Sequence, residues 1–437
     1  MKINRLTSLF LFLFCLFSGQ VGVNAEEIHL ITIDGTIGPP MANYVVGNIE
    51  EAEDEDAHAI LIEVNTPGGL DTSMREIIKS IMNSPLPIIG YVAPEGARAA
   101  SAGSFIIIAC DINAMTPTSS IGAAHPVSMG GGIIDSTMEQ KVLNDILSYM
   151  SSIAEKQGRN VEVARKMITE SISLTAEEAQ AENIIDFVAR SRSELLTLID
   201  STEIKKNDES LILHTRNATV IPKDMSVIER FFYHITDPNI AYILLILGIY
   251  GLLAEFSAPG IGFAGVVGTI CLILALFGLS TLPVNIAGIL LIIAGVVLLI
   301  LEIRTPTFGI VGIGGIVGIV LGSLMLIPFQ APSFLRISIH LILGVGIFTA
   351  LFLLLLLTLV IKVHRKKVTT GKEGILGNIG YAKSELNPDG LVWVQGELWR
   401  AESLEGKIEI NEPVEIVDVK NLKLFVKRRK SPHSSEE

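Results

Sequence analysis

Two stretches of small residues in the first half of the chain could arrange backbone amides and a hydroxyl around a reacting carbonyl. Gly68 and Gly69 follow an apolar segment, and glycines at such a turn let backbone N–H groups point towards a bound oxygen. Ser101 lies in a run of alanine, serine and glycine, whose small side chains let a substrate carbonyl approach its hydroxyl. These residue types suggest acyl transfer with Ser101 as a candidate nucleophile, and the alternative is that Pro-Gly-Gly at residues 67–69 is only a turn.

A serine becomes a nucleophile only when a base accepts its proton, and the sequence offers two bases. Lys141 lies at the edge of an apolar stripe in a predicted helix over residues 136–154, and burial against that stripe would lower the pKa of its amine. The alternative is an exposed lysine that pairs with Asp145, about one helical turn later. His125, which precedes a proline in a loop, is the rival base or else a structural histidine.

Other residues offer less chemistry. Three serines are weaker nucleophile candidates, because each is equally explained as a helix cap or turn residue: Ser104, Ser119 and Ser120. The three cysteines form neither a disulfide framework nor a pair with metal-ligand spacing: Cys15, Cys110 and Cys271. We therefore expect a site without a metal or a cofactor.

The elements that must position these residues alternate between strands and helices. Short buried strands are predicted at residues 28–33, 59–64, 88–92, 106–109 and 184–188. Helices are predicted at residues 41–53 and 73–82. This alternation predicts an α/β domain with a largely parallel sheet over residues 26–200, and the more polar residues 201–238 are predicted to be a linker.

The composition indicates that this domain is only one part of the protein. Of the 437 residues, 49% are hydrophobic and 18% are charged, and the mean hydropathy of +0.52 is too high for a purely soluble enzyme. Residues 26–238 carry 15 basic and 32 acidic side chains, so the acidic excess behind the net charge of −13 lies here. Because phosphate binding needs a basic surface, nucleic acid is not an expected partner.

An apolar block at residues 239–363 predicts a membrane region of about five helices. The apolar segments are residues 240–255, 261–279, 286–301, 308–327 and 339–361, each near the ~20 residues that cross a bilayer. Basic residues at 362–367 follow the last segment and place the C-terminal side in the cytoplasm. Residues 1–25 have the pattern of a signal peptide, with a retained anchor as the alternative, so the α/β domain is expected outside the cytoplasm of a multi-pass inner-membrane protein.

A short motif repeats inside the membrane region. Residues 255–262 match residues 302–309, and a glycine-rich apolar helix follows each copy. We interpret the repeat as a device for close helix packing. The alternative is an ion or substrate path between the two repeats.

Residues 364–430 predict a small all-β barrel. Strands are expected near residues 380–383, 390–394, 398–401, 406–410, 414–419 and 422–426, joined by turns. Trp393 and Trp399 are interpreted as core aromatics, with a binding platform as the alternative. Residues 431–437 are expected to be a disordered tail.

Several of these motifs resemble the NfeD family of membrane-bound ClpP-class serine peptidases. The similar segments are Asn-Thr-Pro-Gly-Gly-Leu at 65–70, Ala-Ala-Ser-Ala-Gly at 99–103, Thr-Ser-Ser-Ile-Gly-Ala at 118–123, Leu-Thr-Ala-Glu-Glu-Ala at 174–179 before Ile-Ile-Asp at 184–186, and Leu-Asn-Pro-Asp-Gly at 386–390. The resemblance covers most of the chain. It implies an α/β ClpP/crotonase-like domain, a polytopic α-helical membrane region and a cytoplasmic OB-fold barrel.

The resemblance also implies a catalytic mechanism. It implies a Ser–Lys dyad, with Ser101 as the nucleophile and Lys141 as the general base. It further implies that the backbone amides of Gly68, Gly69 and Ala102 form the oxyanion site.

The expected function is that of a serine endopeptidase that cleaves extended, apolar segments of membrane-associated proteins. The family implies stomatin-like (SPFH) membrane proteins as partners, beside membrane lipid, and analogy suggests a homo-oligomer of at least two copies. Because ClpP itself uses serine, histidine and aspartate, His125 stays open as an alternative base. The alternative function is a membrane scaffold that acts with such partners and has little or no proteolytic activity.

Overall fold

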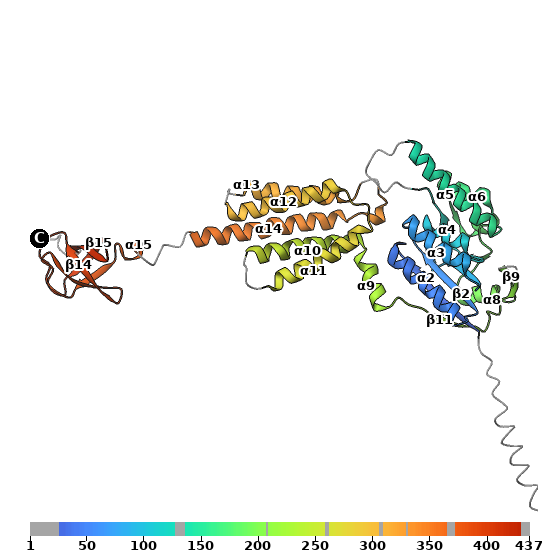
Figure 1. Cartoon of the computed structure of the whole chain (residues 1–437), viewed down its shortest axis with the longest axis horizontal. Helices are drawn as coiled ribbons and strands as arrows, with labels where there is room; N and C mark the ends of the chain where they lie inside the picture. The colour runs from blue at the N-terminus through green and yellow to red at the C-terminus, as the bar shows by residue number, and fades with distance from the viewer. Residues whose placement is uncertain are drawn as a thin grey trace, which may run out of the picture. The chain divides into compact units, whose positions relative to one another are not determined.

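The computed structural model describes residues 26–126, 136–206, 209–257, 262–305, 309–328, 331–364 and 372–429 (Figure 1). The chain divides into two compact units, Met1–Ala350 and Leu351–Glu437. The signal peptide predicted at residues 1–25 and the tail predicted at residues 431–437 lie outside the described residues.

A six-stranded parallel sheet forms the centre of the N-terminal domain. Its strands lie in the order β11 (Thr219–Pro222), β1 (Glu27–Asp34), β2 (Ala59–Asn65), β3 (Ile88–Val92), β5 (Ile112–Met115) and β8 (Phe187–Val188). Each neighbouring pair is parallel. The predicted α/β domain with a largely parallel sheet is therefore confirmed.

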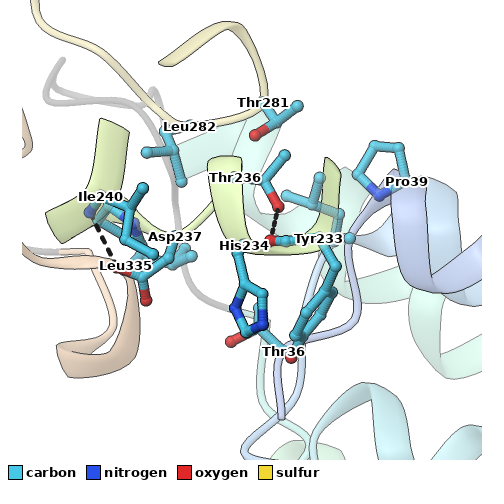
Figure 2. Close-up of a pocket in the computed structure, with 13 residues that line it drawn as sticks. Thr36, Pro39, Tyr233, His234, Thr236, Asp237, Ile240, Thr281, Leu282 and Leu335 are labelled. Carbon is cyan, nitrogen blue, oxygen red and sulfur yellow. Dashed lines mark hydrogen bonds between the residues drawn. The ribbon is translucent and has the colours of Figure 1, made fainter. Parts of the chain in front are cut away.

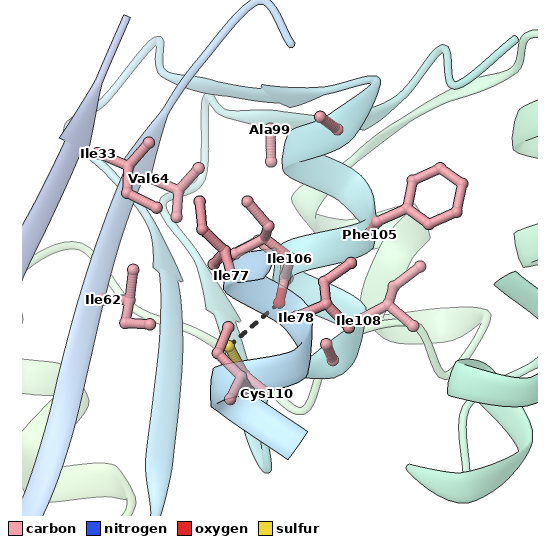
Figure 3. Packing of buried hydrophobic residues seen from close by; sticks show 14 of the residues in the cluster. Ile33, Ile62, Val64, Ile77, Ile78, Ala99, Phe105, Ile106, Ile108 and Cys110 are labelled. Atoms are coloured by element: carbon pink, nitrogen blue, oxygen red, sulfur yellow. Dashed lines mark hydrogen bonds between the residues drawn. The ribbon is translucent and has the colours of Figure 1, made fainter. Parts of the chain in front are cut away.

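Apolar side chains cover both faces of this sheet, as expected for a parallel sheet. The helices are α2 (Pro39–Asp54), α3 (Asp71–Asn83), α4 (Ala102–Ala109), α5 (Ser136–Lys156), α6 (Val161–Thr169), α7 (Ala176–Ala181) and α8 (Arg192–Leu198). In the larger cluster, Ile77 of α3 and Ile106 of α4 lie beside Ile62 and Val64 of β2 (Figure 3). Leu195 of α8 belongs to a second cluster, which also contains the strand residues that point to the opposite face of the sheet.

One predicted strand is wrong. Residues 106–109 form the end of α4, and the strand follows at β5. A short apolar run is ambiguous between a buried strand and a buried helix, and all eight residues of α4 are buried. The strand predicted at residues 184–188 is also shorter than expected, since β8 contains only two residues.

A second, smaller sheet holds the small-residue runs. It consists of β4 (Arg98–Ala100), β6 (Ser120–Gly122) and β7 (Ser173–Thr175). An isolated bridge joins Thr66, just after β2, to Ala99 in β4. The two segments that the sequence singled out, around Gly68 and Ser101, therefore lie next to each other.

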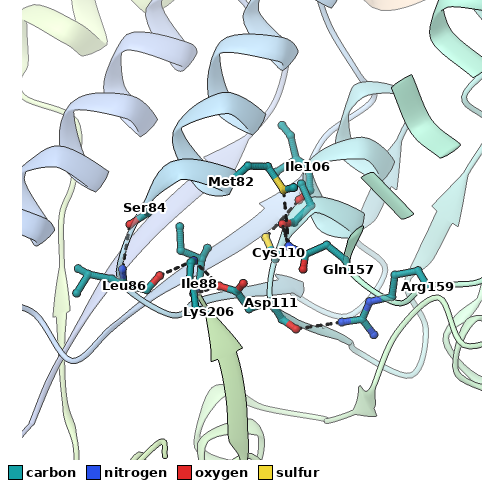
Figure 4. A network of polar contacts seen from close by, with 11 residues as sticks. Met82, Ser84, Leu86, Ile88, Ile106, Cys110, Asp111, Gln157, Arg159 and Lys206 are labelled. Atoms are coloured by element: carbon teal, nitrogen blue, oxygen red, sulfur yellow. Dashed lines mark hydrogen bonds and ion pairs between the residues drawn. The ribbon is translucent and has the colours of Figure 1, made fainter. Parts of the chain in front are cut away.

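Residues 201–238, which were predicted to be a linker, have a regular structure. They contain the hairpin of β9 (Glu203–Lys206) and β10 (Glu209–Ile212), the edge strand β11 and helix α9 (Val227–Ile235). Lys206 Nζ lies 2.6 Å from Asp111 Oδ2, and the two side chains are 7% and 8% exposed (Figure 4). The sequence is polar because much of β9 and β10 is exposed. The buried ion pair of Lys206 with Asp111 connects β9 to the rest of the domain.

Five apolar helices follow among the described residues, in agreement with the prediction. They are α10 (Pro238–Ser257), α11 (Phe263–Ser280), α12 (Ile286–Arg304), α13 (Ile310–Leu326) and α14 (Ile339–His364). By length and composition α10 and α11 could each cross a membrane, and the other three contain shorter apolar helices. Glycines let α10 approach α11 and α12 approach α13, because a Cβ on Gly251 or Gly295 would meet the backbone of the neighbouring helix.

The repeated motif is explained by helix capping. The carboxylate of Glu255 accepts hydrogen bonds from the amides of Gly262 and Gly265, both at 3.2 Å, at the start of α11. Glu302 repeats this arrangement at the start of α13, at 2.9 and 3.1 Å. The first amides of a helix lack intrahelical acceptors, and the helix dipole favours an anion there. The glycines that follow each glutamate support the interpretation of the repeat as a packing device, because a Cβ on Gly268 or Gly315 would meet the neighbouring helix.

The second unit contains a closed five-stranded barrel. The strands lie in the order β12 (Ile379–Ala382), β13 (Asp389–Val394), β14 (Glu397–Ser403), β16 (Lys423–Arg428) and β15 (Pro413–Lys420). Strands β14 and β16 are parallel, and the other neighbours are antiparallel. The predicted barrel is an OB-fold. The strand predicted at residues 406–410 is wrong, because only an isolated bridge forms there.

The two tryptophans of the barrel differ from each other. Trp399 packs against the barrel core, as predicted. Trp393 is 44% exposed, so its assignment to the core is wrong. Val392 and Val394 fill the interior, and the alternation of a strand then points Trp393 outwards.

Candidate active site

Ser101 occupies the turn between β4 and α4. It is the N-cap residue of α4, and its backbone has φ 53° and ψ −117°, which a residue with a side chain rarely adopts. Its amide donates a hydrogen bond to the carbonyl oxygen of Gly122 at 3.0 Å, which holds the turn in place. A strained residue at a strand-to-helix turn is typical of a nucleophile presented at a helix N-terminus.

Gly68 lies directly beside Ser101. A Cβ atom on Gly68 would lie 2.7 Å from Ser101 Cβ and 3.1 Å from Ser101 Oγ, and the φ of Gly68 is +116°. Both constraints require glycine. The amide of Gly68 donates to Thr66 Oγ1 at 3.0 Å, so this predicted oxyanion donor already has an acceptor.

Residues 68–70 pair with Ile37, and the amide of Gly69 points away from Ile37. Ile37 N donates to the carbonyl of Gly68 at 3.0 Å, and the amide of Leu70 donates to the carbonyl of Ile37 at 2.8 Å. Successive residues of an extended segment direct their amides to opposite edges, so the amide of Gly69 faces the other edge. It has no hydrogen-bond partner among the described residues. The amide of Ala102 is the first of α4 and needs no intrahelical acceptor.

Ser101 and Lys141 line the same cavity, which has a volume of about 680 Å³. The lining is largely apolar and includes Phe105, Met138 and Val142. Lys141 is exposed, as in the alternative of an exposed lysine, and it is not buried against the apolar stripe. No hydrogen bond joins Ser101 to Lys141 within the described part of the chain. The fold therefore brings the predicted nucleophile and base into one cavity without direct contact.

Asp145 pairs with Arg75 rather than with Lys141. Arg75 Nη2 lies 2.5 Å from Asp145 Oδ2, and Arg75 Nε lies 2.9 Å from Asp71 Oδ2. The guanidinium also lies 4.3 Å from the centre of the Tyr149 ring. These contacts join α3 to α5, the helix that carries Lys141. The sequence analysis missed Arg75, because no spacing rule links residues so far apart in the chain.

His125 also lines the cavity. Its Nδ1 lies 2.9 Å from the carbonyl oxygen of Ile168. A carbonyl can only accept, so Nδ1 carries a proton and, in the neutral ring, Nε2 is an acceptor. The geometry therefore keeps His125 open as an alternative base.

The weaker candidates are held by structural hydrogen bonds. Ser104 Oγ lies 2.8 Å from the carbonyl oxygen of Ala99, and Ser119 Oγ donates to a backbone carbonyl at 2.8 Å. Ser120 is the first residue of β6. Burial raises the pKa of the Cys110 thiol, which makes a thiolate nucleophile unfavourable. In the portion of the chain that is described, no group of three or more histidine, cysteine or acidic residues could hold a metal ion.

The fold and the site together define a membrane protein that combines a ClpP-like α/β domain with an OB-fold barrel. Three family models match its three parts. The N-terminal domain of NfeD1b matches residues 27–218, the NfeD integral membrane domain matches residues 239–359, and the NfeD-like C-terminal, partner-binding domain matches residues 372–428.

Two curated relatives cover nearly the whole chain. A protein of Pyrococcus horikoshii named membrane-bound protease PH1510 is 40% identical over 390 residues, which are 87% of this chain and 88% of the relative. The membrane protein NfeD1b of Bacillus subtilis is 28% identical over 450 residues, which are 97% of this chain and 98% of the relative. The chain belongs to the NfeD family.

A solved structure resembles part of the chain. It is described as a lysine-to-alanine mutant of the 1510-N membrane-bound stomatin-specific protease in complex with a substrate peptide. It is 33% identical, covers 49% of this chain and 100% of its own, and has a TM-score of 0.46.

Proposed function

We propose that the protein is a membrane-bound serine endopeptidase with a Ser–Lys dyad. Ser101 Oγ attacks a peptide carbonyl, and Lys141 accepts the proton and returns it to the leaving amine. The amides of Gly69 and Ala102, with Gly68 beside them, stabilise the oxyanion. The observation that carries the proposal is the strained Ser101 at a helix N-terminus, in a cavity that also holds Lys141.

The lack of direct contact between Ser101 and Lys141 is compatible with this proposal. Catalytic hydrogen bonds are often long in the absence of substrate and tighten in the complex. Lys141 lies in the first half of α5, and an occupied cavity would shield its amine from water.

The substrate is an extended, apolar peptide segment. Met138 and Val142 line the cavity and are among the exposed large apolar residues of the domain, as expected for a surface that a substrate covers. The substrate backbone pairs with the edge of residues 68–70 that carries the amide of Gly69, because Ile37 occupies the opposite edge. The P. horikoshii relative is named a protease, and the name of the 1510-N protein includes stomatin-specific. We therefore assign stomatin-like membrane proteins as partners whose apolar segment is cleaved.

The test is cleavage of an apolar peptide library by the full-length protein in detergent, followed by mass spectrometry. The variants are Ser101→Ala, Lys141→Ala and His125→Ala. The expected result is a loss of about 10³-fold or more in turnover for Ser101→Ala and Lys141→Ala, but not for His125→Ala. Matched controls are Ser148→Ala and Lys156→Ala, which remove the same groups from exposed positions of α5.

The outcomes distinguish the two candidate bases and test Ser101 as the nucleophile. A large loss for His125→Ala with a small one for Lys141→Ala would replace the dyad by a histidine mechanism. Equal turnover in wild type and Ser101→Ala would reject the serine peptidase. Because the controls change α5 without touching the cavity, they separate chemistry from loss of structure.

A scaffold is the second candidate function, and one observation favours it. The family model for residues 372–428 describes a partner-binding domain, which simple proteolysis does not require. In this case the barrel recruits a stomatin-like protein and the α/β domain contributes little turnover. Co-purification of such a partner with Ser101→Ala, together with an unchanged cellular phenotype of that variant, would favour the scaffold over the peptidase.

The membrane topology belongs to the same proposal. We assign five spans, the α/β domain to the outside and the barrel to the cytoplasm of an inner-membrane protein, since basic residues follow α14 in the sequence. We also assign at least a dimer. Protease protection in right-side-out vesicles tests the topology, because only the α/β domain should be digested. Cross-linking in the membrane tests the oligomer.

A further inference from the structure

Helix α9, Val227–Ile235, joins the α/β domain to the first membrane helix. Ser226 and Glu229 form a capping box at its start, with Ser226 N donating to Glu229 Oε2 at 2.8 Å and Glu229 N donating to Ser226 Oγ at 3.3 Å. This reciprocal cap satisfies two of the first amides, so the segment has its own signal to form a helix. It is not a simple connector.

The side chains of α9 divide between two faces. At 3.6 residues per turn, the apolar side chains fill an arc of about 140°. These residues are Val227, Ile228, Phe231, Phe232 and Ile235. Ile235 is buried, whereas Val227, Ile228 and Phe231 are 86%, 69% and 49% exposed. Such a contiguous apolar surface marks an interaction site.

The opposite face holds α9 on the α/β domain. Tyr233 Oη donates to the carbonyl oxygen of Asp34 at 3.0 Å. Lys223, just before the helix, lies 2.8 Å from carboxylate oxygens of Glu51 in α2 and of Glu55, the C-cap residue of α2. These contacts fix the rotation of α9, so its apolar arc cannot turn into the core of the domain.

The exposed face continues into the membrane region. Helix α10 begins at Pro238, where Asp237 Oδ1 accepts a hydrogen bond from the amide of Ile240 at 3.2 Å (Figure 2). Phe232 of α9 lies edge to face with Phe277 of α11, with 5.4 Å between the ring centroids. Phe277 is itself an exposed apolar residue inside the stretch that matches the integral membrane domain. The apolar arc of α9 thus adjoins an exposed apolar residue of the region that matches the integral membrane domain.

We propose that α9 is an interfacial membrane helix whose apolar face, Val227, Ile228 and Phe231, lies between the lipid headgroups and the acyl chains. Only two residues separate α9 from α10, so the helix cannot move far from the membrane surface. Arg230 and His234 are exposed beside the apolar arc, where their polar ends can reach headgroups and water. The bilayer is therefore the occupant of this face, and α9 is an anchor of the α/β domain in addition to the spans.

The test measures the environment of single positions in the full-length protein in phosphatidylcholine–phosphatidylglycerol nanodiscs. Ile228→Cys and Phe231→Cys carry a nitroxide label, in a background in which Cys15 and Cys271 are alanine and Cys110 is buried. Accessibility to oxygen, which partitions into lipid, is compared with accessibility to a water-soluble nickel chelate. The expected ratio of oxygen to nickel accessibility is about fivefold higher at both positions than at Arg230→Cys on the polar side of the helix.

Further positions and outcomes decide the proposal. Leu198→Cys is the matched control, since Leu198 is an exposed apolar residue of α8, away from the membrane helices in the sequence. Ratios at positions 228 and 231 as low as at position 198 would place the face in water and overturn the proposal. Low accessibility to both reagents would mean that protein, such as a second copy of the chain, covers the face, and would also overturn it. Circular dichroism of each labelled protein verifies that it is folded.

Discussion

Ser101 and Gly68 are so close that the position of Ser101, the proposed nucleophile, depends on the absence of a side chain on Gly68. A Cβ on Gly68 would lie 2.7 Å from Ser101 Cβ, which is closer than real Cβ atoms approach other atoms. Ser101 already has an unfavourable backbone conformation and cannot relax without leaving its turn. The loop after β2 and the turn before α4 therefore define the site together.

Gly68→Ala is expected to displace Ser101 and to lower kcat/KM for peptide cleavage by about 100-fold or more, since a shift of about 1 Å at a reacting group has an effect of this size. The measurement is turnover of a cleaved peptide by the full-length protein.

The matched control is Gly96→Ala. Gly96 also has a positive φ, +81°, but a Cβ there would meet nothing within 4 Å. Both variants carry backbone strain, and only Gly68→Ala crowds the serine. Equal losses of activity would mean that strain, not displacement of Ser101, explains the effect.

Arg75 is expected to position Lys141 through α5. Arg75→Met removes the ion pairs to Asp71 and Asp145, which are partly exposed, so the free energy of unfolding should change by only about 1 kcal/mol. Turnover should fall more, by about 10-fold, because the first half of α5 carries Lys141, the proposed base. Hydrogen exchange should become faster at residues 136–147 and stay unchanged at residues 150–156.

Arg165→Met is the control for Arg75→Met. Arg165 Nη1 contacts Ser151 Oγ at 3.2 Å, in the second half of α5. It should leave turnover unchanged. A loss of turnover without faster exchange around Lys141 would instead assign Arg75 to substrate contact.

The sequence predicted most elements that carry strong periodicity, and it failed where the signal was short or long-range. The helix over residues 136–154 and the parallel strands follow from apolar spacing. The state of residues 106–109 does not follow from apolar spacing, since four apolar residues fit a strand and a helix equally well. In the structure they are the last turn of α4, whose N-cap residue is Ser101.

The sequence suggested candidate site residues, but not how they lie relative to one another. Small residues pointed to Ser101 and Gly69, because chemistry close to the backbone needs them. The pairing of Asp145 with Arg75 depends on how α3 and α5 pack, and an i, i+4 rule therefore suggested the wrong partner. The exposure of Lys141 likewise depends on how α5 packs against the cavity.

His29 is expected to make the α/β domain less stable in mild acid. It is fully buried in β1, and burial, followed by the nearby Lys223, lowers its pKa below 6.5. As the pH falls below about 6.5, the unfolded chain binds a proton that the folded chain does not. The stability that the neutral histidine contributes is present above that pH and is lost as the pH falls towards the folded-state pKa.

His29→Leu should remove this part of the pH dependence. Hydrogen exchange of the peptide containing β1, compared between variant and wild type at each pH, measures it. The difference should grow below pH 6.5. A difference that is constant with pH would assign the effect of His29 to packing alone.

The two repeated glutamates should differ in their contribution to the membrane region, although their hydrogen bonds are alike. Glu302 is 1% exposed and Glu255 is partly exposed, so removal of Glu302 leaves the capped amides without water as a substitute. Glu302→Ala is expected to destabilise the helices by about 2 kcal/mol and Glu255→Ala by about 1 kcal/mol.

The measurement is thermal exposure of Cys271 in α11 to a thiol-reactive dye in detergent, with Cys15 and Cys110 replaced by alanine. Glu302→Gln should recover part of the loss, because its amide oxygen can still accept one hydrogen bond. Equal midpoints for Glu302→Ala and Glu255→Ala would contradict the capping argument. An ion path would instead require an ionisable group at position 302, so Glu302→Gln would abolish flux in liposomes while the midpoint stayed near that of the wild type.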